Sequence, residues 1–178
     1  MIASLTLAVI VHFVNLAGAP SAVVRDAQTE AAAMFRDVGV EVVWADDVSS
    51  ARYGSSESVR VTLLPYEIGA LRGGDRTVLG AATRTDSGSG VAWVFYRRVE
   101  SESVRNDVAV ARILACAMAH EIAHLLQSSP AHADEGVMRA VWRRGDYARA
   151  ARGLLRFTPA DADGFGQSQV HGGEHGGR

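Results

Sequence analysis

The segment His-Glu-Ile-Ala-His at residues 120–124 contains the side chains with the clearest chemical potential. It lies in a long apolar stretch that predicts a helix, and helical residues four apart share one face. His120 and His124 can therefore each present a ring nitrogen to one Zn²⁺ ion at about 2.0–2.1 Å. A zinc ion with an open coordination position activates water, and Glu121 is placed to take the proton of that water. The segment predicts a zinc hydrolase site with Glu121 as general base.

A catalytic zinc site needs a third protein ligand, because its fourth position is left for water or substrate. His132 is the candidate that we favour. It follows His124 by eight residues, across a Ser-Ser-Pro segment at residues 128–130 that has to turn. Asp134 and Glu135 remain alternative ligands, since a carboxylate can complete such a site.

The other histidines and the single cysteine are weaker candidates. Cys116 lies one turn before His120, but a lone cysteine on an apolar helix is expected in the core rather than on a metal. We expect His12 to be a satisfied histidine in or near the sheet. His171 and His175 lie in a glycine-rich tail that offers a metal little preorganisation.

The segment from His120 to His132, followed by Gly-Val-Met-Arg-Ala-Val-Trp at residues 136–142, resembles the metzincin zinc peptidases. It is most similar to a set of poorly characterised bacterial metzincin-like proteins. In that set a third histidine and a Gly-Ile/Val-Met-Arg-Ala-x-Trp stretch follow the HExxH helix. The likeness covers most of residues 5–160, with further matches at residues 40–44, 94–96 and 157–159.

This resemblance implies a peptide-hydrolysing enzyme with a three-layer αβα fold and a mostly parallel sheet that has an antiparallel edge strand. It implies that Val91–Tyr96 is the edge strand along which an extended peptide lies by β-augmentation. It also implies a methionine turn at Met138, where a soft apolar side chain packs beneath the histidines. The ligands and the general base that it implies are His120, His124, His132 and Glu121.

The chain departs from the usual metzincin pattern HExxHxxGxxH at two positions. That pattern has glycine at position 127 and histidine at position 130, where this chain has Gln127 and Pro130. The bacterial set has the longer spacing to the third histidine, but a glycine where Ser128 stands. A left-handed turn at that position is less favourable for serine than for glycine.

Two other functions remain open on the same residues. The chain could be a non-catalytic zinc-binding protein that keeps the site, or a zinc hydrolase that acts on a non-peptide bond. The formal net charge is −2 and every basic residue is arginine, so no basic stripe indicates a nucleic-acid partner. A single cysteine excludes an intrachain disulfide. Oligomeric state and cellular location stay open.

The elements that position these residues are predicted to form one domain over residues 1–162. With 178 residues and 48% hydrophobic side chains, the chain is long enough to bury a core. Apolar runs predict strands at Leu5–Val14, Val40–Trp44 and Val59–Leu64, with an amphipathic helix from Pro20 to Asp37 between the first two. This order implies parallel pairing with a right-handed crossover, hence an α/β layer.

The N-terminal run has a second interpretation, because Ala-Gly-Ala at residues 17–19 is similar to a signal-peptide cleavage site. No lysine or arginine occurs before Arg25, whereas a signal peptide has a positive first region. His12 and Asn15 also interrupt the apolar run, which weakens a membrane-spanning interpretation. We therefore favour a buried strand.

The second half of the chain is predicted to be mostly helical. Glycine-rich residues 65–90 predict a long irregular excursion, which leads to a strand at Val91–Tyr96. The zinc helix is expected to run from Val104 or Asp107 to Gln127. Two shorter helices are predicted downstream, at Asp146–Arg152 and after Thr158. Residues 163–178 have too few apolar side chains to pack and predict a disordered tail.

Overall fold

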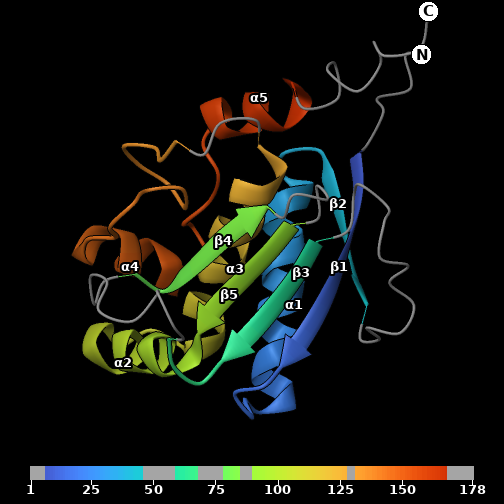
Figure 1. Cartoon of the computed structure of the whole chain (residues 1–178). Helices are drawn as coiled ribbons and strands as arrows, with labels where there is room; N and C mark the ends of the chain where they lie inside the picture. The colour runs from blue at the N-terminus through green and yellow to red at the C-terminus, as the bar shows by residue number, and fades with distance from the viewer. Residues whose placement is uncertain (1–6, 46–58, 68–77, 85–89, 128–130, 168–178) are drawn as a thin grey trace, which may run out of the picture.

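The computed structural model describes residues 7–45, 59–67, 78–84, 90–127 and 131–167 (Figure 1). They contain a five-stranded sheet with the order β2-β1-β3-β5-β4, in which β4 pairs antiparallel with β5 and the other pairs are parallel. The strands are β1 Leu7–Asn15, β2 Val40–Ala45, β3 Val59–Leu64, β4 Gly80–Arg84 and β5 Gly90–Phe95. The predicted α/β class, with a mostly parallel sheet and an antiparallel edge strand, is confirmed.

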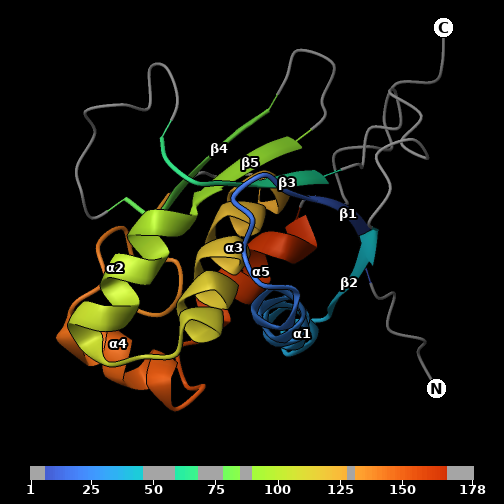
Figure 2. The ribbon, with the colours of Figure 1, turned by 90° about the horizontal axis from the view of Figure 1, so that it is seen from below.

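The helices of the described residues lie on one side of this sheet (Figure 2). They are α1 Ser21–Arg36, α2 Tyr96–Asn106, α3 Val110–Leu126, α4 Arg144–Ala151 and α5 Pro159–Gln167. On the other side of the sheet, the paired residues Ile10 and Val43 are 52% and 47% exposed. The described part of the chain therefore forms two layers, and the third layer of the expected αβα arrangement is not found among the described residues. The reason is that, among the described residues, only the connection from β1 to β2 contains a helix.

The edge strand next to α3 is β4, and the prediction that Val91–Tyr96 forms this edge is wrong. β5 lies between β3 and β4, with Val94 opposite Leu63 on one side and Gly80 on the other. An uninterrupted apolar run is typical of a strand that is buried within a sheet, so the composition of β5 agrees with its central position. β4 has the sequence Gly-Ala-Ala-Thr-Arg, which has little intrinsic strand propensity, so the sequence predicts an irregular segment there instead of a strand.

The helix that carries His120 and His124 starts later than predicted, because two helices, α2 and α3, replace the single expected one. Tyr96 begins α2 instead of ending a strand, and α2 runs to Asn106. Asp107 then adopts a left-handed conformation with φ 54°, which ends α2 before α3 begins at Val110. Aspartate is among the few residues besides glycine that tolerate this conformation. The other end was predicted well, since α3 ends at Leu126 and the backbone of Gln127 is extended.

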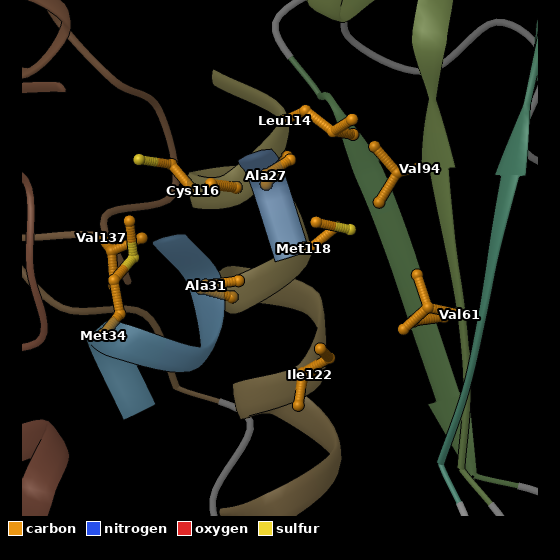
Figure 3. Packing of buried hydrophobic residues seen from close by; sticks show 14 of the residues in the cluster. Ala27, Ala31, Met34, Val61, Val94, Leu114, Cys116, Met118, Ile122 and Val137 are labelled. Atoms are coloured by element: carbon orange, nitrogen blue, oxygen red, sulfur yellow. The ribbon is translucent and has the colours of Figure 1, made fainter. Parts of the chain in front are cut away.

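Helix α3 is the centre of the hydrophobic core. Three side chains at helical spacing, Leu114, Met118 and Ile122, are fully buried and face Val61 and Val94 of the sheet (Figure 3). A second face of α3 packs against α1, where the residues at the contact include the fully buried Ala27 and Ala31. Small side chains allow two helices to approach closely. A helix enclosed in this way has a fixed position, so the side chains on its remaining face are fixed too.

The N-terminal run is a strand from Leu7 onward, as predicted, and its His12 is buried within β1 and has an interaction partner. The positions of α1, β2 and β3 are also confirmed. Residues 1–6, the Ser-Ser-Pro segment at 128–130, and the two tail histidines lie outside the described residues. In the described part of the chain, no helix combines the length and the apolar character needed to cross a membrane.

The C-terminal helix extends further than predicted, because α5 continues to Gln167 and so includes residues 163–167 of the expected tail. Phe165 explains the difference, since it is buried with its ring centroid 5.8 Å from that of Phe35 and 5.3 Å from that of Phe157. Phe165 thus packs α5 against the hydrophobic core. The remainder of the expected tail lies outside the described residues.

Between α4 and α5 the chain runs through a segment whose packing can be tested with two adjacent leucines. Leu155 is 0% exposed and Leu154 is 54% exposed. We expect Leu155→Ala to lower the free energy of unfolding by about 2–5 kcal/mol, whereas Leu154→Ala changes it by less than about 1 kcal/mol. Chemical denaturation of both variants measures the two values. Equal effects of the two substitutions would contradict the described packing of this segment.

Candidate metal centre

Three histidines meet at the C-terminal end of α3. His120 and His124 lie one turn apart on this helix, and His132 reaches them after the chain has left the helix. The Nε2 atom of His124 is 3.0 Å from Nε2 of His120 and 3.2 Å from Nε2 of His132. One nitrogen of each ring lies within 4.8 Å of the other two. In the described part of the chain, Asp134, Glu135 and Cys116 do not belong to this group.

A backbone carbonyl determines which nitrogen of His120 is free. The Nδ1 atom of His120 lies 2.9 Å from the carbonyl oxygen of Val137, and a carbonyl can only accept a hydrogen bond. Nδ1 therefore carries the proton, and the lone pair of Nε2 points toward the other two rings. A hydrogen bond from the second ring nitrogen to a carbonyl is a usual partner of metal-binding histidines, because it sets the tautomer and the ring orientation.

The three nitrogens fit a cation better than they fit one another. His124 can donate at most one proton from Nε2, so it cannot hydrogen-bond to both neighbouring Nε2 atoms at once. Its Nδ1 atom is buried and has no hydrogen-bond partner among the described residues. Around a tetrahedral zinc ion with bonds of 2.0–2.1 Å, ligand nitrogens lie about 3.3 Å apart. The observed separations of 3.0 and 3.2 Å are within a few tenths of an ångström of that value.

The ionisation of the histidines also suits metal binding. Burial lowers the pKa of His120 to about 4 and also lowers the pKa of His124, so both rings are neutral at pH 7. A neutral imidazole is the form that binds a metal. Burial raises the pKa of Glu121 to about 8, whereas a divalent cation beside the carboxylate would favour its ionised form.

Glu121 lies against the edge strand β4. An ideal Cβ atom built on Gly80 would be 2.7 Å from both Cγ and Oε1 of Glu121, and 2.6 Å from the carbonyl oxygen of Trp93. The carboxylate thus occupies the space that any side chain at position 80 would need. At the other end of β4, the guanidinium of Arg84 donates a hydrogen bond to the carbonyl of Leu125 in α3. The edge strand and the histidine-bearing helix are therefore in direct contact at both ends of β4.

Cys116 is a core residue, as expected. It is 2% exposed, belongs to the hydrophobic cluster, and points away from the sheet on the side of Met34 and Val137 (Figure 3). Burial raises the pKa of its thiol to about 12, so the thiolate needed for metal binding is disfavoured.

The segment after His132 folds into a tight turn around Gly136 and Met138. The N–H of Ala133 donates to the carbonyl of Met138 at 3.0 Å, and the Gly136 backbone has φ +75°. A Cβ atom on Gly136 would lie 2.8 Å from the carbonyl oxygen of Arg156, so glycine is required here for two reasons. Met138 is fully buried, and its contact beneath the histidines stays a prediction.

Sequence reasoning missed three contributors to this site: Gly80, the Val137 carbonyl, and Trp142, whose Nε1 donates to the same carbonyl at 3.1 Å. A glycine within a strand indicates close approach of another group, but β4 is not predicted as a strand from its sequence, so this signal could not be used at Gly80. A backbone carbonyl leaves no mark in the sequence, so its role could not be predicted.

Comparison with known proteins identifies no relative: no protein-family description matches the chain, and no curated protein matches it significantly. The function of the site therefore has to be inferred from its geometry and from the resemblance of its motifs.

The contact between Gly80 and Glu121 is testable through protein stability. Gly80→Ala should force Glu121 or β4 to move, and we expect a loss of about 1–3 kcal/mol in the free energy of unfolding, as for other overpacked sites. Gly145→Ala is the matched control, because a Cβ atom there meets nothing within 4 Å. In helix α4 this change should be neutral or stabilise by up to about 1 kcal/mol. A Gly80→Ala protein as stable as the parent would contradict the close approach of both Glu121 and the Trp93 carbonyl to Gly80.

Proposed function

We propose that the chain is a zinc-dependent metallopeptidase of metzincin-like type. His120, His124 and His132 would bind the zinc ion, and Glu121 would act as general base. The observation that carries the proposal is the convergence of three imidazole Nε2 atoms at the end of the helix that also carries the buried Glu121, whose carboxylate lies against the edge strand β4. The alternative is a non-catalytic protein in which the same three histidines bind zinc without hydrolysis. Zinc binding and peptide hydrolysis therefore need separate tests.

Each part of the site has a role in this proposal. A bound zinc ion supplies a Lewis acid, which polarises the substrate carbonyl and makes water a nucleophile at neutral pH. Glu121 accepts a proton from the attacking water as the new C–O bond forms. It then returns the proton to the amine nitrogen as the C–N bond breaks, so that its carboxylate is regenerated.

Strand β4 offers a place for the substrate backbone. It pairs only with β5 among the described residues, so its second edge presents backbone N–H and C=O groups to a partner. An extended peptide that pairs with this edge would lie beside Glu121, because Gly80 of β4 contacts the carboxylate. β4 thus takes the substrate-binding role that the resemblance had placed on Val91–Tyr96.

The ligand set is tested by removing one histidine at a time. We expect His132→Ala to weaken zinc binding by more than about 100-fold, since even the loss of an outer-sphere partner costs about 10–100-fold. Asp134→Ala is the matched control: this neighbouring side chain is exposed and outside the histidine group, so zinc binding should be unchanged. Elemental analysis of untagged protein and chelator competition measure the metal. Loss of zinc in Asp134→Ala but not in His132→Ala would exclude His132 as the ligand.

The general base is tested with a substitution that keeps the shape of the side chain. We expect Glu121→Gln to retain one zinc per chain and to lower hydrolysis of casein or a peptide library by at least about 10²–10⁴-fold. Glu135→Gln, an exposed carboxylate on the segment that follows His132, serves as control and should cleave like the parent.

Two results would contradict the proposal. A Glu121→Gln protein that cleaves as fast as the parent would exclude Glu121 as the base. A parent protein that binds one zinc ion but cleaves no peptide would favour either the non-catalytic protein or a hydrolase of a non-peptide bond, and a panel of other amide and ester substrates separates these two.

A further inference from the structure

Two side chains donate to the same backbone carbonyl beside the metal centre. The oxygen of Val137 accepts from Nδ1 of His120 at 2.9 Å and from Nε1 of Trp142 at 3.1 Å. A carbonyl oxygen has two lone pairs, so these two donors use its full capacity. Trp142 is thereby linked to a candidate metal ligand through one atom, although its N–H does not contact the ligand itself.

The indole ring of Trp142 also lies next to the ligand. Its centroid is 6.4 Å from that of His120 with the rings at 78°, an edge-to-face arrangement. On another side it meets Tyr147 of α4 in the same arrangement, at 5.9 Å and 78°. Tyr147 is buried, so the indole lies between a fixed aromatic ring and the imidazole. Aromatic rings prefer this geometry, which restricts their rotation.

The backbone of Val137 is held on its N-terminal side as well. Its N–H, which belongs to the peptide plane before its carbonyl, donates to the carbonyl of Arg156 at 2.9 Å, and its side chain is fully buried. The bond to Arg156 thus fixes the position of residue 137, while His120 and Trp142 bond to the Val137 carbonyl itself. His120 receives its orientation from this carbonyl.

We propose that Trp142 is a positioning residue for the metal centre. Its N–H and its ring hold the Val137 carbonyl and the His120 imidazole so that Nε2 of His120 points to His124 and His132. The inference rests on the proposed zinc centre. Trp142 acts through His120, and its effect should appear in metal affinity before any substrate is present.

The Trp142 N–H has two opposing effects on zinc binding by His120. Sharing the carbonyl with a second donor slightly weakens its hydrogen bond to His120, which makes the imidazole a poorer ligand. Fixing the carbonyl and the ring in one orientation favours metal binding. Loss of outer-sphere partners of metal-binding histidines costs about 10–100-fold in affinity, so the orienting effect dominates.

Trp44 provides a matched control in the same chain. Its Nε1 atom also donates to a backbone carbonyl at 3.1 Å, that of Gln28, and its ring is edge-on to Phe13 at 6.1 Å. Both tryptophans are partly buried. Trp142→Phe and Trp44→Phe therefore remove the same kind of hydrogen bond and keep an aromatic ring, but only the first lies beside the histidines.

The test is the zinc dissociation constant of the two variants, measured by chelator competition, together with their melting temperatures. We expect Trp142→Phe to bind zinc about 10-fold or more weakly and Trp44→Phe to bind it like the parent. Melting temperatures of the metal-free variants should be similar, because Val137 keeps a donor in Trp142→Phe. Equal zinc affinities of the two variants would overturn the inference while leaving the zinc centre intact. A parent that binds no zinc would overturn both.

A second measurement uses the parent protein and does not depend on the folding of a variant. In ¹H–¹⁵N spectra, addition of one equivalent of zinc should shift the indole N–H resonance of Trp142, since its acceptor also bonds to a metal ligand. The resonance of Trp44 should stay in place. An unmoved Trp142 signal in a zinc-loaded protein would contradict the inference.

Discussion

The burial of helix α3 is the constraint on which the site depends. One face of the helix packs on the sheet through residues such as Met118 and Ile122, and another packs on α1. Full burial of such a side chain stabilises the fold by about 1.5–3 kcal/mol, so several of them fix the helix firmly. The backbone positions of His120 and Glu121 are consequently fixed by packing contacts that involve neither side chain. The desolvation that shifts their pKa values is a cost that this apolar packing offsets.

The helical pair His120 and His124 and the third histidine, His132, are positioned by different parts of the structure. The helix provides His120 and His124 at a spacing that backbone geometry guarantees. His132 lies on irregular chain and depends on the turn that follows it, where Ala133 bonds to Met138. This turn packs closely against the segment at Arg156, because a side chain at position 136 would collide with the carbonyl oxygen of Arg156. A change in the turn would therefore affect the third histidine more than the helical pair.

Sequence pattern predicted the elements with a strong local signal, and it failed where that signal is weak. Strands β1 to β3 are apolar runs, helix α1 is amphipathic, and the pair His120 and His124 follows from a spacing of four on a helix. β4 has a sequence that forms a strand only because β5 and α3 lie beside it. The approach of His132 to the pair was expected from the sequence, but the backbone bonds of the turn that follows it cannot be read from side-chain types. The hydrogen bonds of His120 and Trp142 to the Val137 carbonyl could not be predicted for the same reason.

Arg156 shows how remote parts of the fold are connected to the three-histidine cluster. Its carbonyl accepts the N–H of Val137, while its guanidinium pairs with Glu30 of α1 at 2.9 Å. Glu30 also pairs with Arg112 near the start of α3. The turn that orients His120 is thus tied through one ion-pair network to both helices of the core. Partly exposed ion pairs contribute little to stability by themselves. The main effect of this network is therefore to fix the position of the turn relative to α1 and α3. A centre whose ligands come from two separate chain segments needs such a link, because metal affinity depends on how well their relative position is preorganised.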